Sequence, residues 1–151
     1  MENEKIIYTV GTSNRSIQEF LEVLTTFGIQ RVVDVRRFPI SRFDHFTREN
    51  VSLELEQAGL EYDFFGDSLG GYRSGGYRGY METDTFQDAL SEVEELGEKE
   101  RLVILCAEKL PWRCHRRFIG TALQEREWKV IHILEKDKTW KSEEQLDLLN
   151  G

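Results

Sequence analysis

Five short apolar runs, separated by longer stretches with helical periodicity, constrain the fold of this chain more than any other feature. The runs lack the alternation of apolar and polar residues that marks a strand with one exposed face. They lie at residues 6–10, 32–35, 60–65, 102–106 and 128–134. Continuous apolar strands between amphipathic helices are typical of a parallel sheet covered on both faces. The pattern therefore predicts an α/β fold: a single domain with a mostly parallel sheet of about five strands and helices on both faces.

Local signals indicate where the helices between these runs begin and end. Ser16 and Glu19 have the spacing of a capping box, and Gly28 supplies a left-handed stop after the first helical stretch. A later helix is expected from about Pro111, because proline is favoured in a first helical turn. This helix would point its amino-terminal end back toward the strand that precedes it.

The length and the amino-terminal residues set the expected organisation. A chain of 151 residues is the size of one domain (1–151), with a core over about 5–134 and a polar C-terminal extension over 135–151. The acidic start lacks the basic region of a signal peptide, and no run reaches the roughly 18 apolar residues of a membrane span. We therefore expect a cytoplasmic protein with no membrane partner, in which cysteines are packed, metal-bound or catalytic rather than a disulfide framework.

The net charge of −8 conceals an uneven distribution. Three segments that follow strands, 31–48, 72–80 and 106–117, together carry a net charge of +8, whereas the remaining residues carry −16. An acidic body is unsuited to wrapping nucleic acid over its whole surface. Ligands of open parallel sheets bind beyond the carboxyl ends of the strands. The distribution therefore predicts a small anion site at that edge; the alternative is that these arginines pair with surface carboxylates.

The densest cluster of chemically capable residues follows the fourth apolar run. Cys106 ends that run, and Glu108 and His115 lie close enough in sequence to act as acid or base. A helix start and nearby arginines would lower the thiol pKa of Cys106 and favour a nucleophilic thiolate. We therefore consider Cys106, Glu108 and His115 as catalytic candidates. The alternative for Cys106 is a small apolar residue packed at the end of a buried strand.

The same cluster offers a weaker zinc hypothesis. Cys106, Cys114 and His115 are three potential ligands, but the cysteines do not form a close Cys-x-x-Cys pair. Adjacent Cys114 and His115 on a helix would point in different directions. His132, in the middle of a predicted strand, is most simply a packed residue. The sequence therefore predicts neither a metal site nor a cofactor.

Polar residues also follow the first two apolar runs. Gly11, Ser13 and Asn14 follow the first run, where they would bind a ligand or simply cap the coming helix. Asp34 and Arg36 follow the second run. Asp34 would either orient Arg36 toward a substrate or form a buried structural pair with it. Arg42, Tyr80, Cys114 and Arg116 complete the expected substrate-binding set.

Residues 66–80 contain six glycines and three tyrosines. They match neither a phosphate-binding loop that ends in Gly-Lys-Ser/Thr nor a dinucleotide-binding Gly-x-Gly-x-x-Gly turn. The glycines are typical of a mobile lid whose Tyr72, Tyr77 and Tyr80 stack on a planar ligand. An ordered loop folded onto its own tyrosines fits the same residues equally well.

Several of these motifs together resemble the family called domain of unknown function 488. The resemblance covers about residues 5–134, and it implies enzyme-like polar motifs without implying a particular reaction. Position 12, often His in that family, is Thr here. The motifs that carry the resemblance are Gly11-Thr12-Ser13-Asn14-Arg15, Val33-Asp34-Val35-Arg36 with Phe38-Pro39, Ser41-Arg42-Phe43, Leu69-Gly70-Gly71, Tyr80-Met81, Cys106-Ala107-Glu108 and Cys114-His115-Arg116.

A looser similarity is to rhodanese-like sulfurtransferases and cysteine phosphatases, which also place a Cys at a strand end and an Arg at the start of the next helix. Those loops have five residues between Cys and Arg, whereas six lie between Cys106 and Arg113. Pro111 and Trp112 also replace the glycines that would expose backbone amides.

Taken together, these patterns favour an enzyme, a Cys- or Glu-dependent transferase or hydrolase, with its site in a strand-end crevice. Its expected partner is a phosphorylated or nucleotide-like small molecule, or a nucleic-acid end or base. The main alternative is a non-catalytic module that binds nucleic acid or a phosphorylated ligand through the same arginines and tyrosines. Sulfur transfer of the rhodanese kind is a third hypothesis.

Overall fold

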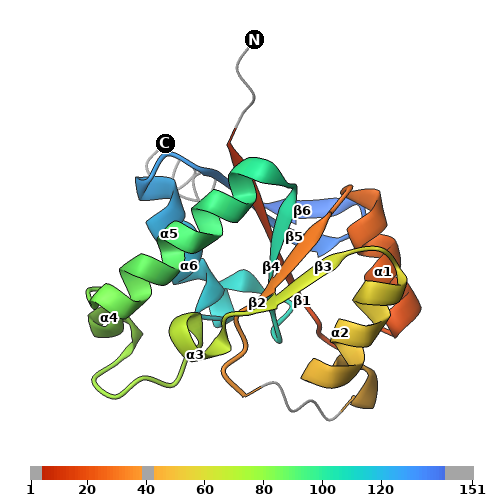
Figure 1. Cartoon of the computed structure of the whole chain (residues 1–151), viewed down its shortest axis with the longest axis horizontal. Coiled ribbons are helices and arrows are strands. Elements are labelled where there is room, and N and C mark those ends of the chain that lie inside the picture. The colour runs from red at the N-terminus through yellow and green to blue at the C-terminus, as the bar shows by residue number, and fades with distance from the viewer. Residues whose placement is uncertain (1–4, 39–42, 142–151) are drawn as a thin grey trace.

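A six-stranded sheet forms the centre of the computed structural model, which describes residues 5–38 and 43–141. The strands lie in the order β3-β2-β4-β1-β5-β6 (Figure 1). The first five run parallel, and β6 runs antiparallel to β5, so the carboxyl ends of the parallel strands meet at one edge. The strands are β1 (Ile6–Gly11), β2 (Arg31–Asp34), β3 (Glu61–Phe64), β4 (Leu102–Cys106), β5 (Lys129–Glu135) and β6 (Lys138–Trp140).

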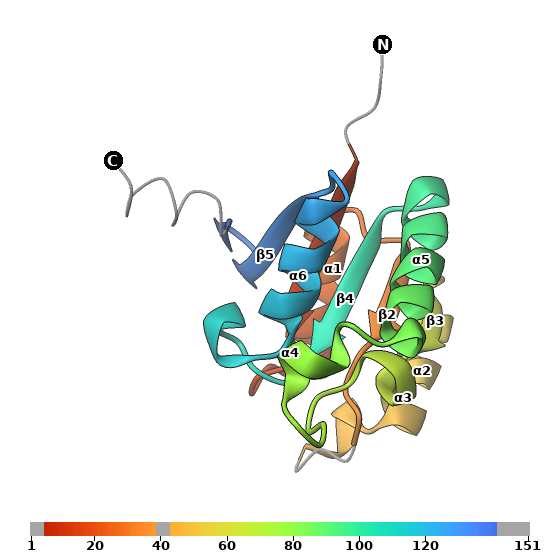
Figure 2. The same cartoon turned by 90° about the vertical axis from the view of Figure 1, so that its left-hand side faces the viewer.

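Helices cover both faces of the sheet (Figure 2). One face packs against α1 (Ile17–Thr26) and α2 (Arg48–Gln57), and the other against α5 (Asp84–Lys99) and α6 (Arg116–Glu125). The shorter elements are the single turns α3 (Gly66–Leu69) and α4 (Tyr77–Tyr80) and two 3-10 turns, η1 (Asp44–Phe46) and η2 (Pro111–Arg113).

The sheet separates two hydrophobic cores, which explains why the strands lack alternation. On β2, Val33 faces the core that includes Phe86 and Leu90 of α5, whereas Val32 faces the core that includes Phe20 of α1. All five of these side chains are fully buried. Residues of the central strands β1, β2 and β4 therefore meet an apolar layer whichever face they point to.

The capping signals act as the sequence predicts. The Ser16 hydroxyl oxygen accepts the N–H of Glu19 at 3.0 Å, and the Glu19 carboxylate accepts the N–H of Ser16 at 2.9 Å. Gly28 has a positive φ of 66°, which any other residue would adopt at a cost. These contacts fix the start and the end of α1, so that the chain returns to the sheet at β2.

The α/β fold with a mostly parallel sheet is confirmed, and one local expectation is wrong. The polar segment after residue 134 contributes the antiparallel strand β6, which pairs with β5. The helix expected from Pro111 begins only at Arg116, because Pro111 opens the 3-10 turn η2 and Cys114 is extended. Within the described part of the chain, no helix combines the length and the apolar character needed to cross a bilayer.

Candidate functional site

A pocket of about 560 Å³ lies at the carboxyl ends of β1, β2 and β4. Its walls come from Thr12 after β1, from residues 36–38 after β2, from parts of 71–77, and from 106–108 and 113–115. Register explains the convergence, because Gly11 of β1 is paired with Cys106 of β4, and Asp34 of β2 with Leu105 of β4. The pocket therefore lies where parallel α/β sheets bind ligands.

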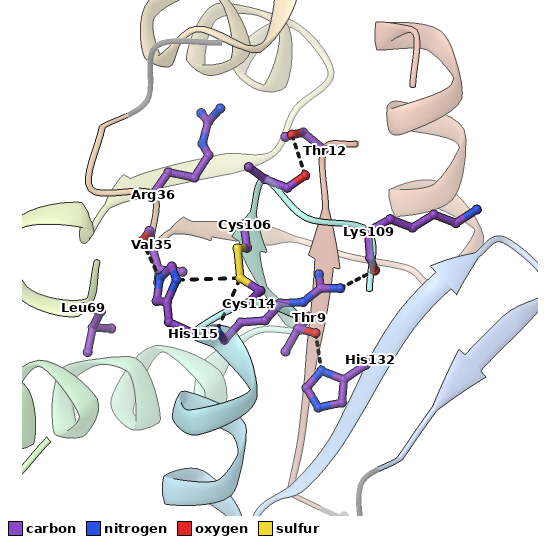
Figure 3. The surroundings of a disulfide bond; sticks show 12 residues. Thr9, Thr12, Val35, Arg36, Leu69, Cys106, Lys109, Cys114, His115 and His132 are labelled. Atoms are coloured by element: carbon purple, nitrogen blue, oxygen red, sulfur yellow. Dashed lines mark hydrogen bonds between the residues drawn. A yellow bond between two sulfur atoms is a disulfide. The ribbon is translucent and has the colours of Figure 1, made fainter. Parts of the chain in front are cut away.

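A disulfide bond between Cys106 and Cys114 lines this pocket (Figure 3). Cys106 ends β4, and Cys114 lies in the extended connection between η2 and α6. The two residues are 3% and 8% exposed. The structure thus corrects the expectation of unlinked cysteines, because Cys106 is bonded to Cys114 and neither has a free thiol.

His115 lies against the same disulfide and has a defined tautomer. Its Nε2 donates a hydrogen bond to the carbonyl oxygen of Val35 at 3.0 Å, so the lone pair is on Nδ1. Nδ1 lies 3.7 Å from Sγ of Cys114 (Figure 3). Burial lowers the pKa of His115, and the charges of Arg116 and Arg73 lower it further, so the ring is neutral near pH 7.

The structure also removes one argument against a metal ion. Cys114 and His115 precede α6 instead of lying on it, and the ligand atoms of Cys106, Cys114 and His115 all lie within 4.8 Å of one another. Metal ions bind thiolates, however, and both sulfurs are consumed by the disulfide. Metal binding at this cluster would therefore require reduction of the bond first.

Arg116 is a buried cation with incomplete pairing. Its side chain is fully buried, and Nη2 donates to the carbonyl oxygen of Lys109 at 2.6 Å, whereas Nε and Nη1 have no hydrogen-bond partner among the described residues. Burial, together with repulsion from Arg15 and against a smaller opposing effect of Glu108, lowers the pKa of Arg116 to about 9. Arg116 is not among the residues that line the pocket, so its expected contact with a substrate stays a prediction.

Arg36 and Asp34 form the buried structural pair that was one of the two alternatives. Arg36 Nε donates to Asp34 Oδ1 at 2.9 Å, and Nη2 donates to Oδ2 at 2.8 Å. The remaining Nη1 donates to the carbonyl oxygen of Phe46, and Tyr62 donates its hydroxyl proton to Asp34 at 2.6 Å. Arg36 contributes to the pocket wall, but its donors are already used within the protein.

The charged groups still available to a ligand are Arg113, Arg37 and Glu108. Arg113 and Glu108 are exposed, and their side chains form no hydrogen bond or ion pair with any residue of 5–38 or 43–141. Arg37 Nη1 donates to the carbonyl oxygens of Gly71 and Tyr72, which leaves its positive charge without a carboxylate partner in the same ranges. Charge counting included these three residues, but only the fold distinguishes them from Arg36 and Arg116.

The tyrosines of residues 66–80 divide into two kinds. Tyr77 and Tyr80 donate their hydroxyl protons to the carbonyl oxygens of Leu69 and Ser68 at 2.7 and 2.6 Å, so they hold the loop together. Tyr72 is instead 86% exposed at the pocket rim, where its ring centroid lies 5.9 Å from that of Phe38. Stacking on a ligand therefore remains open to Tyr72, whereas Tyr80 packs in the ordered loop of the alternative hypothesis.

The segment after β1 forms a second hollow of about 550 Å³ beside the pocket. Ser13 and Asn14 line it, and it shares Ala107, Glu108 and Arg113 with the pocket. Gly11 packs closely against the backbone of the segment that follows β4. A Cβ atom at Gly11 would lie 1.9 Å from the carbonyl oxygen of Glu108, so this position requires glycine for packing. Arg42, another expected ligand, lies outside the described residues.

Together these features define an α/β protein of the open parallel-sheet class with an arginine-flanked pocket and a cysteine pair at its strand ends. The chain belongs to the family described as Domain of unknown function DUF488, whose family model matches residues 16–123. This match confirms the resemblance inferred from the motifs. Neither the curated proteins nor the solved structures contain a significant match.

Proposed function

We propose that this protein is an enzyme that binds an anionic small molecule, phosphorylated or nucleotide-like, in the strand-end pocket. The main support for this proposal is the lining of the pocket. Arg37 and Arg113, which have no carboxylate partner among the described residues, lie there with the acid–base candidates Glu108 and His115. Guanidinium groups pair well with phosphate oxygens. The buried charge of Arg116 adds a positive field that no carboxylate within hydrogen-bonding distance among the described residues neutralises.

The rim of the pocket supports a ligand with a planar part. Tyr72 and Phe38 are 86% and 62% exposed and lie side by side, so a base or aromatic ring has an apolar surface on which to stack. Tyr72 is held with a positive φ of 60°, which costs a bulky residue on the order of 1–3 kcal/mol. Such costs concentrate at ligand-binding sites, which is why this residue supports the proposal.

Glu108 is the preferred acid or base of the proposed reaction. It is exposed and lines both hollows, so its carboxylate can reach a ligand in either of them. His115 is neutral and has a lone pair on Nδ1, but this atom faces Cys114 instead of open space. Glu108 therefore takes the acid–base role toward a ligand, and His115 the role of orienting the cysteine pair.

Binding is tested first with inorganic phosphate and ADP by isothermal titration calorimetry. We expect both to bind, and we expect Arg113→Gln to weaken ADP binding about tenfold, which corresponds to about 1.4 kcal/mol. Arg78→Gln is the matched control, because Arg78 is also exposed but lies in a different groove beside α6. Absence of binding, or equal weakening in the two variants, would contradict an anion site at this pocket.

Turnover is tested separately with a panel of nucleoside mono- and diphosphates followed by ³¹P NMR. Glu108→Gln should abolish turnover while leaving ADP affinity within about twofold of the wild type. ADP binding without turnover of any panel member would favour the non-catalytic module, which the exposed Tyr72 and Phe38 also fit. A single-stranded oligonucleotide binding tighter than ADP would support that module directly.

A further inference from the structure

The disulfide lies at the amino-terminal end of a regular helix. Cys114 immediately precedes His115, the N-cap of the ten-residue helix α6. The backbone N–H of Arg116, in the first turn, points to Sγ of Cys114 with an N···S distance of 3.5 Å. Both the helix dipole and this N–H favour a negative charge on the sulfur of Cys114. Cys106, at the end of β4, receives no such contact among the described residues.

A second observation concerns the charge of the residue whose backbone contacts this sulfur. The guanidinium of Arg116 keeps two donor nitrogens without a partner among residues 5–38 and 43–141, and the backbone N–H of the same residue contacts Sγ of Cys114. A buried cation without a counter-anion is costly, and an anion that forms in the same region reduces that cost. A thiolate at Cys114, two residues before Arg116 in the chain, would supply a negative charge after reduction.

The two cysteine residues differ slightly in exposure as well as in their contacts. Cys114 is 8% exposed and Cys106 is 3% exposed, and both line the pocket. This difference has the direction expected when Cys114 is the sulfur that an incoming thiolate attacks. His115 Nδ1, 3.7 Å from Cys114 Sγ, is placed to accept a hydrogen bond from the Cys114 thiol in the reduced form. Figure 3 shows both cysteines and His115 converging at this point.

We propose that Cys106 and Cys114 form a redox-active dithiol/disulfide centre, with Cys114 as the sulfur that exchanges and Cys106 as the resolving sulfur. Its substrates are low-molecular-weight thiols and disulfides, and the preference for anionic ones rests on the anion site proposed above. This assignment differs from the sequence-based one, which made Cys106 the nucleophile. The difference follows from the position of the helix, which begins at Arg116 and so directs its end toward Cys114.

The exchange needs a dithiol, or two thiols, as the reductant. A thiolate of the reductant attacks Sγ of Cys114, the S–S bond breaks, and its electron pair leaves on Cys106, which takes up one proton. The reductant's sulfur is now bonded to Cys114 in a mixed disulfide. A second thiolate of the reductant then attacks that reductant sulfur and releases Cys114 as a thiol or thiolate. Two electrons pass to the protein, and the reductant leaves as a disulfide. The reverse sequence reduces a disulfide substrate.

The first test is equilibration of the full-length protein with mixtures of glutathione and glutathione disulfide, in the presence of EDTA. The fraction oxidised is read by acid quenching, alkylation and intact mass. We expect one two-electron transition within accessible ratios of the two forms, because redox-active disulfides equilibrate with the glutathione pool and structural ones resist it. A bond that stays intact in excess glutathione, or thiols that stay free in excess glutathione disulfide, would overturn the proposal.

The second test assigns the roles of the two sulfurs. In the reduced protein, Cys114 of the Cys106→Ser variant should react with iodoacetamide on the order of tenfold faster than Cys106 of the Cys114→Ser variant. Wild-type protein treated with limiting iodoacetamide and mapped by peptide mass gives the same comparison where a variant does not fold. Equal reactivity, or faster reaction of Cys106, would refute the assignment of Cys114.

The third test separates this inference from the proposed anion site. Reduced protein is mixed with glutathione disulfide, which is anionic, or with cystamine, which is cationic. We expect glutathione disulfide to react on the order of tenfold faster at low salt, and Arg113→Gln to reduce that preference with little change in the cystamine rate. Equal rates with both probes would contradict the anion site and leave the redox centre standing. No reaction with either would refute the redox centre.

Discussion

Arg36 and Arg116 are both buried near the edge of the sheet that holds the pocket, yet their electrostatic environments are opposite. Arg36 donates to both carboxylate oxygens of Asp34 and to the carbonyl oxygen of Phe46. Arg116 has one carbonyl partner and two nitrogens without a partner in the described ranges. A fully paired cation fixes structure, whereas an incompletely paired one keeps a field that an anion can use. Arg36 therefore holds the structure of this edge together, whereas the charge of Arg116 is available to the function proposed above.

The largest expected effect is on stability, from removal of the paired arginine. Arg36→Met leaves the fully buried Asp34 carboxylate without its cation, which should lower the free energy of unfolding by about 3–5 kcal/mol in urea denaturation. The double variant Arg36→Met with Asp34→Asn should recover part of this loss, because no buried charge then remains. A loss below about 1 kcal/mol in the single variant would show that the pair is not the structural element described above.

An intermediate effect should follow from acid, through a histidine close to the incompletely paired arginine. Burial, together with the charge of Arg116, lowers the pKa of His132 to about 3. The unfolded chain takes up a proton near pH 6.5 while the folded protein does not, so stability is complete above pH 6.5 and is lost as the pH falls toward 3. Between pH 7 and pH 4.5, His132 should lower the free energy of unfolding by about 2–3 kcal/mol.

Urea unfolding at the two pH values measures this acid effect. The His132→Gln variant should lose that part of the pH dependence, although it also changes the hydrogen bond between Thr9 and His132. Comparison of slopes against pH, instead of absolute stabilities, removes the second contribution. An unchanged slope in the variant would assign the acid sensitivity to other groups and weaken the connection with Arg116.

The smallest expected change in stability follows from removal of the incompletely paired arginine. Arg116→Met should alter the free energy of unfolding by no more than about 1 kcal/mol, because the lost hydrogen bond is offset by relief of a buried charge. The same variant should slow the alkylation of Cys114 in reduced protein, since the thiolate loses a nearby cation. A stability loss as large as that of Arg36→Met would abolish the distinction between the two arginines.

The sequence predicts the layers of the molecule well, because those depend on local pattern. Apolar runs and the Ser16 capping box placed the parallel strands and α1 correctly. Strand β6 could not be predicted from pattern, since Lys138 and Thr139 are exposed and the strand has only three residues. Its formation depends on pairing with β5, which no local signal encodes.

The composition of the site was less predictable than its location. The charge of the post-strand segments indicated the edge at which the structure has a pocket, but the contacts of single arginines depend on partners far along the chain, such as Phe46 for Arg36. Pro111 suits the first turn of an α-helix and of a 3-10 turn alike, so the true start of α6 was hidden. Because that start lies after Cys114, the residue next to the amino-terminal end of the helix is Cys114 instead of a residue near Pro111.

The order of the strands has a consequence for hydrogen exchange. β4 lies between β2 and β1, and β1 lies between β4 and β5, so both have hydrogen-bonded neighbours on either side. Amide protons in such central strands exchange with deuterium only when the whole domain opens, whereas those of loops exchange by local fluctuation. Cys106 should therefore be among the slowest residues to exchange, and the exposed Tyr72 across the pocket among the fastest. We therefore expect the wall at Cys106 to open only with the domain itself, and the rim at Tyr72 to open by local fluctuation.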